Sequence, residues 1–397
     1  MKKIINKNTN TIIPYGRQDI NQADIDAVVA VLRSDFLTQG PSVPVFEKAV
    51  ADYCGAQHAV AVNSATSALH IACLALSVGK GDSVWTTPTT FVASANCALY
   101  CGATVDFVDI DPNTYNLSVE RLAEKLALAE KTGKLPKVVI PVDLCGQSCD
   151  MAGIYALGQQ YGFKIIEDAS HAIGAKYKKE PIGSGRFSDI TIFSFHPVKI
   201  ITSGEGGMAV TNDTTLAKKM RLLRSHGITS NAAEMQSRPA QETWNYQQID
   251  LGFNYRMTDI QAALGLSQMM RIDSFIEKRH RIAQRYDSEL SGLSIQTPWQ
   301  HPDNYSAIHL YTIRIKKNKS GTTQRQVYDA MQLAGINVNL HYIPVYRQPY
   351  YEAIGFKVGY CPEAEQYYQE VLSIPMYPTL TDTEQTKVIR VIRETLV

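Results

Sequence analysis

Apolar positions change their spacing several times along the chain, and each spacing predicts one type of secondary structure. Apolar residues at i, i+3, i+4 and i+7 over residues 21–35 predict a helix, for which Asn21 is the expected N-cap. Strands alternating with helices follow, which indicates a largely parallel sheet covered on both faces. The expected strands are 58–62, 82–88, 104–110, 137–144 and 163–169, and the expected helices are 64–76, 90–102 and 151–162.

The alternation changes near residue 190, because two expected strands follow each other directly within residues 189–210. Beyond them the strands become sparse, which indicates a smaller α+β domain. The elements expected in this part are helices at 215–227, 257–290 and 324–336 and a strand at 309–315. We therefore expect an α/β fold with a large domain over 14–268, a small domain over 269–397 and an N-terminal segment, 1–13, packed nearby.

Composition narrows the class of protein. The 397 residues carry a formal net charge of +1 and are 45% hydrophobic, which is typical of a globular protein. There is no basic excess and no run of about 18 or more apolar residues, so neither nucleic-acid binding nor a membrane span is expected. The N-terminal residues lack the apolar core of a signal peptide, so we expect a cytoplasmic protein whose seven cysteines are reduced.

The first segment that suggests chemistry is NSATSAL, residues 63–69, between an expected strand and an expected helix. Small hydroxyl residues at this position expose the backbone N–H groups of a helix N-terminus, which suits an anion such as phosphate. Ser64 or Thr66 would equally serve as a simple N-cap of the helix. The residues alone do not decide between these two interpretations.

Asp168 and Lys199 each follow an expected strand of the central sheet. Ligands bind at the carboxyl ends of strands in open parallel sheets, although Asp168 also suits a turn. Burial disfavours the charged form of an amine, which suits Lys199 to nucleophilic Schiff-base formation; the alternative is a lysine that reaches solvent. The glycines of residues 203–207 permit a close backbone approach behind it.

These features fit one cofactor better together than any of them does alone. Pyridoxal phosphate (PLP) needs a lysine for its aldehyde, an acid for its ring nitrogen and an anion cradle for its phosphate. Lys199, Asp168 and residues 63–69 offer one group of each kind. A turn that presents Asn254 and Arg256 before an apolar helix is the fourth segment of interest.

The chain resembles the sugar aminotransferases of the DegT/DnrJ/EryC1/StrS family, which have the type I PLP fold of aspartate aminotransferase. The resemblance runs nearly end to end, through NSATSALH, EDASHAIGA, FSFHPVKIITSGEGG and GFNYRMTDIQAALG. FSFHPVK and LHYIPVYRQPYY are most similar to the branch that aminates C4 of a UDP-linked 4-keto-6-deoxy-N-acetylhexosamine toward pseudaminic acid. The resemblance implies PLP or its amine form PMP, a UDP-linked keto sugar, glutamate and 2-oxoglutarate, and a homodimer with shared active sites.

The resemblance also implies roles for single residues. Lys199 matches the Schiff-base lysine and acid–base catalyst, Asp168 the partner of the ring nitrogen, and Phe91 the aromatic residue that stacks on the ring, with ordinary core as its alternative. His171 stands where many relatives have Gln, beside the ring hydroxyl. The implied phosphate contacts are Ala65, Thr66, Ser194 and, from the other subunit, Asn254. The expected substrate-binding residues are Tyr15, Arg256, His309, His341 and Tyr342.

Several other functions stay open at this point. An aminotransferase for another nucleotide-linked keto sugar, at C3 or with dTDP, has the same cofactor residues. A dehydratase branch of the family carries histidine in place of the lysine, so Lys199 argues against it. A non-catalytic PLP-binding regulator would need a basic DNA-binding segment, which the sequence lacks. The nine histidines lack the spacing of a zinc site, so no metal is expected.

Overall fold

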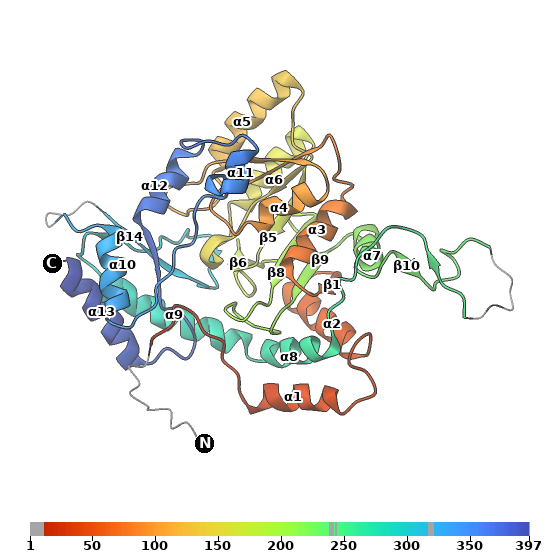
Figure 1. The fold of residues 1–397 in the computed structure, drawn as a ribbon, viewed down its shortest axis with the longest axis horizontal. Helices are drawn as coiled ribbons and strands as arrows, with labels where there is room; N and C mark the ends of the chain where they lie inside the picture. The colour runs from red at the N-terminus through yellow and green to blue at the C-terminus, as the bar shows by residue number, and fades with distance from the viewer. Residues whose placement is uncertain (1–11, 238–241, 243, 317–320, 397) are drawn as a thin grey trace, which may run out of the picture.

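A mostly parallel sheet forms the centre of the larger part of the molecule (Figure 1). The computed structural model describes residues 12–237, 242, 244–316 and 321–396. Among these residues the sheet has seven strands in the order β1-β9-β8-β5-β4-β2-β3. They are β1 (His58–Val62), β2 (Ser83–Thr86), β3 (Thr104–Phe107), β4 (Val138–Ile140), β5 (Lys164–Asp168), β8 (Ile190–Ser194) and β9 (Gly207–Thr211). The predicted α/β fold is confirmed.

The direction of the strands brings their carboxyl ends to one edge of the sheet. Strand β9 runs antiparallel to both of its neighbours, β1 and β8, so these two run in the same direction. The remaining neighbours, from β8 to β3, pair in parallel. Segments that follow β1, β2, β4, β5 and β8 therefore emerge along one edge, as the sequence suggested for Asp168 and Lys199.

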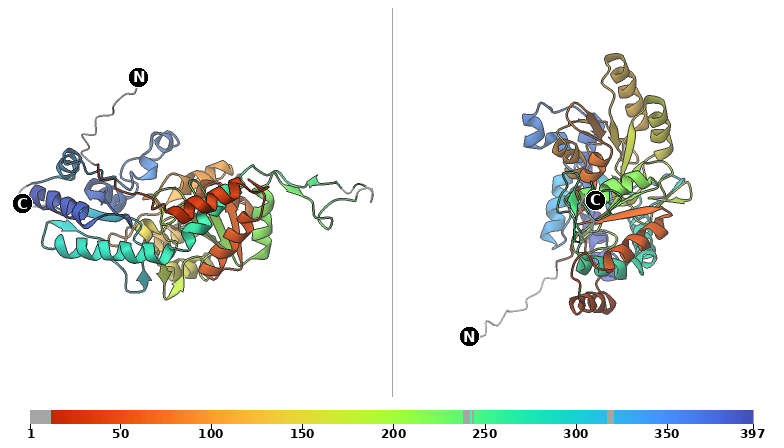
Figure 2. Two further views of the ribbon diagram at one scale, coloured as in Figure 1. Left: turned by 90° about the horizontal axis from the view of Figure 1, so that it is seen from below. Right: turned by 90° about the vertical axis from the view of Figure 1, so that its right-hand side faces the viewer.

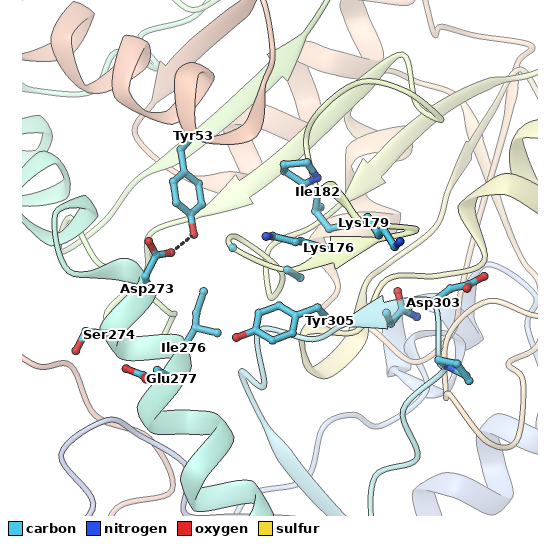
Figure 3. A pocket seen from close by; sticks show the side chains of 15 residues that line it. Tyr53, Lys176, Lys179, Ile182, Asp273, Ser274, Ile276, Glu277, Asp303 and Tyr305 are labelled. Carbon is cyan, nitrogen blue, oxygen red and sulfur yellow. Dashed lines mark hydrogen bonds between the residues drawn. The ribbon is translucent and has the colours of Figure 1, made fainter.

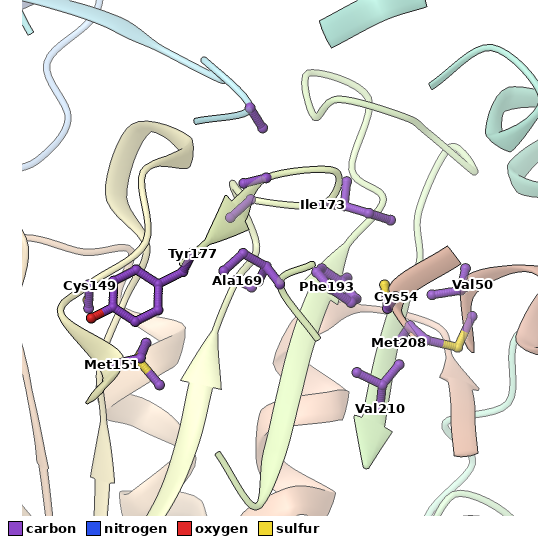
Figure 4. Close-up of a cluster of buried hydrophobic side chains, with 14 of the residues drawn as sticks. Val50, Cys54, Cys149, Met151, Ala169, Ile173, Tyr177, Phe193, Met208 and Val210 are labelled. Atoms are coloured by element: carbon purple, nitrogen blue, oxygen red, sulfur yellow. The ribbon is translucent and has the colours of Figure 1, made fainter. Parts of the chain in front are cut away.

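Helices cover both faces of the sheet, and successive strand residues supply the two cores. Ile190 and Ile192 of β8 pack with α3 (Ala65–Ala75), α4 (Ala93–Tyr100) and α7 (Thr214–Leu223). Phe193, on the opposite face, packs in the cluster of Figure 4. The helices on that face are α2 (Ser42–Cys54), α5 (Val119–Thr132), α6 (Met151–Tyr161) and α8 (Asp259–Met269).

A smaller antiparallel sheet lies in the C-terminal part of the chain, at the other end of the molecule (Figure 1). Its strands are β12 (Ile295–Gln296), β14 (Tyr311–Ile315) and β15 (Val371–Ile374), and its helices are α10 (Gln324–Leu333) and α13 (Asp382–Leu396). Ile13 pairs with Ile336 and so joins this part, whereas residues 1–11 of the predicted N-terminal segment lie outside the described residues.

The prediction of one helix over 257–290 is wrong, because this segment forms two helices. Helix α8 ends at Met269, and α9 (Ile272–Glu289) begins after Arg271, whose backbone is not helical. The Arg271 guanidinium forms ion pairs with Asp19, which precedes α1 (Gln22–Leu32), and with Asp24 in the first turn of that helix. No glycine or proline marks the break, so a contact with a distant part of the chain sets it.

The predicted division at residues 268 and 269 falls near this break. Helix α9 places Phe275 in the first core and Tyr286 in the core of the small sheet, so one helix joins both parts. Segment 345–371 packs partly against α3 and α4 of the large sheet. The domain bounds therefore stay a prediction.

The remaining elements are short. The expected N-cap Asn21 accepts a hydrogen bond from the backbone of Asp24, as the sequence suggested. Strands β10 (Ile228–Thr229) and β11 (Gln247–Gln248) form a ribbon that extends away from the body of the molecule (Figure 2). The others are β6 (Lys176–Tyr177), β7 (Glu180–Pro181), β13 (Asn304–Tyr305), α11 (Pro349–Ala353), α12 (Pro362–Glu370) and the 3-10 turns η1 (Leu144–Gly146) and η2 (Val345–Arg347).

The cysteines and the apolar segments were the subject of two further expectations. All seven cysteines lie in described parts of the structure and are free thiols. Within those same parts, no helix combines the length and the apolar character that a membrane crossing requires.

Candidate functional site

A cavity of about 920 Å³ opens at the carboxyl edge of the large sheet. The ends of β1, β5 and β8 form one wall, and residues of the small-domain side form the other. Most of the residues expected from the sequence meet here, although Asn254 and Arg256 do not line this cavity. Those that line it are Tyr15, Ala65, Thr66, Phe91, Asp168, His171, Ser194, Lys199, His309, His341 and Tyr342.

Lys199 lies in the loop that connects β8 to β9. Backbone bonds close this loop at its base, from Phe195 N–H to Gly206 O at 2.9 Å and from Ser203 N–H to Phe195 O at 3.0 Å. Burial lowers the pKa of the Lys199 amine to about 8, and the nearby Asp168 carboxylate opposes that shift. Among the described residues no side chain or backbone group forms a hydrogen bond with this amine, so it is available to a ligand in the cavity.

Asp168, the last residue of β5, is held as a buried carboxylate in the cavity wall. Its Oδ2 accepts a hydrogen bond from Ser94 Oγ at 2.7 Å, and its Oδ1 accepts one from Ser170 Oγ at 2.6 Å. The backbone N–H of Ser170 also donates to Oδ1 at 3.2 Å, which closes a local turn. The turn interpretation and the site interpretation of Asp168 are therefore compatible.

The N-terminus of α3 contributes backbone N–H groups to the same cavity. Ser64 is its N-cap and accepts from the N–H of Ser67, so the N–H groups of Ala65 and Thr66 have no partner inside the helix. A side chain at Gly207 of β9 would place its Cβ 2.5 Å from the backbone of Ser64 and Ala65. Glycine is thus required where the strand passes under the helix start. Ser194, at the end of β8, also faces the cavity.

His171 is buried beside Asp168, and its protonation follows from its partners. The backbone N–H of Cys145 donates to His171 Nδ1 at 3.3 Å, so this nitrogen accepts. Burial lowers the pKa of His171 well below its ordinary value, and the charge of Lys199 adds to the shift. The ring is therefore neutral with its proton on Nε2, which lies 3.4 Å from the hydroxyl of Tyr342.

Two further imidazoles complete the small-domain wall. Burial lowers the pKa of His341 to about 3 and that of His309 well below its usual range, so both are neutral. Ser373 Oγ lies 2.7 Å from His341 Nδ1 and fixes that ring. Nδ1 of His309 is buried and has no hydrogen-bond partner among the described residues. The His309 and His171 ring centroids are 4.4 Å apart.

The remaining predicted residues lie at the open side of the cavity or outside it. Phe91 is 60% exposed although it lines the cavity, so the described residues leave much of its side chain open. Asn254 is exposed and pairs with Ser225, and Arg256 pairs with Val62 at the end of β1. Neither Asn254 nor Arg256 reaches the cavity of its own chain.

A second cavity, of about 860 Å³, lies between α2, the β6–β7 turn and the start of α9 (Figure 3). Its charged residues include Lys176, Lys179 and Asp273, and the last of these accepts a hydrogen bond from Tyr53 at 2.7 Å. Both lysines are exposed to solvent. This cavity therefore lacks the buried free amine that distinguishes the first.

The donor set of the first cavity fits PLP. The free backbone N–H groups of Ala65 and Thr66 with the Ser194 hydroxyl suit a phosphate. The Asp168 carboxylate suits a protonated ring nitrogen, and the Lys199 amine suits an aldehyde. Among the described residues, no cluster of His, Cys, Asp or Glu side chains is arranged to hold a metal ion.

Sequence reasoning missed residues that orient the predicted ones. Ser94 lies in the first turn of α4, three positions after Phe91, which precedes the helix, so its spacing from Phe91 could have indicated it. Ser170 follows Asp168 by two residues, which is the spacing of a local side-chain turn. Asn339 also lines the cavity, but no motif marks it.

The chain was compared with known proteins. The DegT/DnrJ/EryC1/StrS aminotransferase family model matches residues 18–393. "Spore coat polysaccharide biosynthesis protein SpsC" of Bacillus subtilis is 39% identical over 388 residues, 97% of either chain. "UDP-4-amino-4,6-dideoxy-N-acetyl-beta-L-altrosamine transaminase" of Campylobacter jejuni is 38% identical over 367 residues, 92% of this chain and 93% of that one.

Solved structures agree with these relatives. Helicobacter pylori PseC, described as an aminotransferase involved in the biosynthesis of pseudoaminic acid, superposes with a TM-score of 0.87 at 29% identity, over 97% of this chain and 99% of that one. The putative sugar aminotransferase Spr1654 from Streptococcus pneumoniae, in its PMP form, gives a TM-score of 0.87 at 31% identity, over 96% and 98%. The type I aminotransferase fold predicted from the sequence is confirmed.

Proposed function

The chain belongs to the DegT/DnrJ/EryC1/StrS aminotransferase family, and from that premise we propose that it is a cytoplasmic enzyme that aminates C4 of a UDP-linked 4-keto-6-deoxy-N-acetylhexosamine. That it is a PLP-dependent sugar aminotransferase follows from the family and its named transaminases. The amino donor is glutamate, which leaves as 2-oxoglutarate. The product is a precursor of pseudaminic acid.

The observation that carries the chemistry is the free amine of Lys199 in the same cavity as the fixed carboxylate of Asp168. PLP, when bound, supplies an aldehyde that holds the amino group and a ring that takes up electrons. The lowered pKa of Lys199, about 8, lets its amine give up a proton near neutral pH. With the cofactor bound, the same amine would take the proton from the α-carbon of the amino donor and return it to the carbon that the cofactor aldehyde supplies.

Other residues hold the reacting groups in place. Ser94 and Ser170 donate to both oxygens of Asp168, so this carboxylate keeps a fixed direction. The α3 N-terminus and Ser194 hold a phosphate at the opposite end of the site. Neutral His171 presents an N–H at Nε2 rather than a second positive charge beside Lys199.

Two observations support the proposed substrate: the activities for which the relatives are named, and the side chains on the small-domain wall of the cavity. A transaminase of a UDP-linked 4-amino-4,6-dideoxy sugar is 38% identical over 92% of the chain, and a pseudoaminic-acid aminotransferase shares the fold over 97%. Tyr15, His309, His341 and Tyr342 present rings and neutral nitrogen or hydroxyl groups. Such groups bind the hydroxyls and apolar faces of a sugar without attracting an unselected anion.

A second subunit completes the proposed site. Lys199 is the only Lys or Arg among the described residues that line the cavity, although a diphosphate and two donor carboxylates must be bound. Phe91 is 60% exposed, and Asn254 and Arg256 do not line the cavity of their own chain. In a homodimer with shared sites these two residues enter the partner's cavity, where Arg256 adds the missing positive charge.

The substrate proposal is tested by turnover. The PLP-loaded enzyme with glutamate is given UDP- and dTDP-linked 4-keto and 3-keto sugars, and the position of the new amine is found by NMR. We expect kcat/KM for the UDP-linked 4-keto-6-deoxy-N-acetylhexosamine to exceed the others at least about tenfold, or ~1.4 kcal/mol. A preference of that size for a dTDP or 3-keto sugar overturns the substrate and leaves the amino transfer standing.

Sharing of the site is tested with mixed dimers. Lys199→Ala and Asn254→Ala chains are co-purified on two tags, so each dimer holds one of each. If Asn254 serves the partner's site, one site carries both defects and the other carries neither. About half of the wild-type activity is then expected, whereas activity near that of the two parents overturns the sharing.

A further inference from the structure

Two buried acidic side chains, Asp143 and Glu167, act on each other behind the large sheet, and among the described residues none of the groups that act most strongly on Asp143 carries a positive charge. Asp143 is 0% exposed and Glu167 is 5% exposed. Oδ1 of Asp143 accepts the backbone N–H of Cys149 at 2.9 Å, but Oδ2 has no partner that could donate to it among the described residues. A buried carboxylate oxygen without a donor is strongly destabilised, so this oxygen must itself carry a proton.

The hydrogen bonds decide which of the two acids holds the proton. Glu167 Oε2 accepts from Thr191 Oγ1 at 2.8 Å and from Ser188 Oγ at 3.2 Å, and these donors stabilise the negative charge on Glu167. Asp143 has a single backbone donor, at its other oxygen. The Asp143 side chain acts on Glu167 as a hydrogen-bond donor, which lowers the pKa of Glu167 and so partly opposes the effect of its burial. Asp143 is therefore the donor and the Glu167 carboxylate the acceptor.

The groups around Asp143 and Glu167 do not neutralise the negative charge of the pair, so a shared proton is the remaining way to lower it. The groups that act on Asp143 are Glu167 and Asp168 on β5 and the thiol of Cys149; Cys54 of α2 faces Glu167. None of these groups carries a positive charge, and Cys54 and Cys149 belong to the apolar cluster of Figure 4. Burial, followed by the charge of Glu167, raises the pKa of Asp143 well above its usual range, and burial raises that of Glu167 to about 6.

The pair lies on the face of the sheet opposite the cofactor residues. Glu167 and Asp168 are neighbours on β5, so their side chains point to opposite faces. Asp143 N–H donates to the backbone oxygen of Asp168 at 3.1 Å, and Asp168 N–H donates to Pro141 O at 2.9 Å. The backbone of Asp143 is thus paired with the strand end that carries Asp168.

The loop of residues 143–149 transmits this restraint to the other wall of the cavity. Cys145 N–H holds His171 Nδ1 at 3.3 Å, and Cys145 O accepts the N–H of His309 at 2.8 Å. A Cβ at Gly146 would lie 2.9 Å from His171 O and 3.0 Å from His309 N. The loop is therefore packed against both histidines without space for adjustment.

We propose that Asp143 and Glu167 share one proton at neutral pH, and that this pair positions the 143–149 loop and through it His171 and His309. Neither acid touches the cavity, so both are positioning residues. Loss of the proton leaves two adjacent buried carboxylates that repel each other, and the loop then loses its anchor behind β5.

The first test uses the protein without cofactor. The infrared spectrum in D2O at pH 7 should contain the carbonyl band of a protonated carboxylic acid, and Asp143→Asn should remove it. The matched control is Asp109→Asn, because both oxygens of Asp109 already accept backbone N–H groups of Glu363 and Ala364. The control should keep the band. A wild-type spectrum without the band overturns the proposal.

The second test follows stability against pH. Unfolded Asp and Glu are ionised above about pH 5, so the unfolded chain holds no proton where the folded pair holds one. The folded state then loses stability as pH rises, and the unfolding constant rises by up to about tenfold per pH unit. The introduced amide of the Asp143→Asn variant still donates to Glu167 but has no proton that titrates. The unfolding constant of this variant should therefore not rise with pH in this way. Equal slopes for wild type and Asp143→Asn between pH 6 and pH 8 contradict the shared proton.

The third test concerns positioning and, unlike the first two, rests on the proposed amino transfer. Asp143→Ala should lower kcat at least about tenfold, and Asp143→Asn should restore it to within about threefold, because an amide still donates to Glu167. Asp143→Leu with the activity of wild type overturns the positioning role. The infrared and stability results do not depend on the reaction, so a wrong substrate and a wrong acid pair are distinguishable.

Discussion

The two walls of the cavity differ in how they treat charge. The sheet wall keeps two ionisable groups ready to act, the Lys199 amine and the Asp168 carboxylate, and supports the latter with Ser94 and Ser170. The small-domain wall buries His309 and His341 as neutral rings. Both walls are equally part of one cavity, so burial alone does not determine charge.

The difference follows from the partners that each wall provides. Asp168 receives three hydrogen bonds from donors, which offset the loss of water around its charge. No acid among the described residues raises the pKa of His309 or His341, and the charge of Lys199 further disfavours their protonation. We infer that the sheet wall carries the proton transfers and that the other wall selects the sugar by shape and neutral hydrogen bonds.

The largest effect should come from removing the amine. Lys199→Ala should lower kcat by at least about 10³-fold, because it removes the group that both holds the cofactor and moves the proton. Borohydride reduction and peptide mapping of the PLP-loaded wild type should find the cofactor on Lys199. The matched control is Lys176→Ala in the second cavity, which should stay near wild type. Label on any other lysine contradicts the assignment.

The next effect should come from the carboxylate. Asp168→Asn should still bind PLP but lose about 10²-fold or more in kcat, because an amide does not keep the ring nitrogen protonated. Glu205→Gln is a suitable control, since Glu205 also lines the cavity but is exposed. An Asp168→Asn variant within about threefold of the wild-type rate would assign this role to another residue.

These two residues were predictable because their signals are local. A strand end in a parallel sheet places Asp168 and Lys199 at the ligand edge, and both lie within a few residues of a clear strand pattern. Together with residues 63–69 they indicated PLP, and the resemblance then named the family. The same local reasoning predicted the strands of the large sheet and the N-cap at Asn21.

What the sequence did not predict depends on contacts between distant segments. The α8–α9 break follows from Arg271 meeting Asp19 and Asp24, about 250 residues away in sequence. Asp143 appeared as part of an ordinary strand end, and only the fold brings its side chain to Glu167. Neutral histidines cannot be told from charged ones without their surroundings.

The pH dependence of cofactor capture tests the sheet wall without any turnover. The amine must be neutral to react, and its pKa of about 8 leaves roughly a tenth of it neutral at pH 7. Capture of PLP by the cofactor-free protein, followed by absorbance, should therefore be about tenfold faster at pH 9 than at pH 7. The Asp168 charge raises the pKa of Lys199, so Asp168→Asn should move the midpoint to lower pH. A wild-type midpoint near the pKa of free lysine contradicts the burial argument.

The smallest effect should come from the neutral wall, and it should appear in binding rather than in rate. His341→Phe keeps a ring but removes its nitrogen atoms, so KM for the sugar nucleotide should rise about fivefold, or ~1 kcal/mol, with kcat nearly constant. Ser373→Ala removes only the group that orients His341 Nδ1, so its KM should change less, by about twofold. The folded ring stays neutral down to about pH 3, whereas the unfolded ring gains a proton below about pH 6.5, so wild-type stability falls on acidification between these values. His341→Phe should lose this part of the pH slope. A fall in kcat as large as that of Asp168→Asn would instead place His341 in the proton-transfer chemistry and remove the distinction between the two walls.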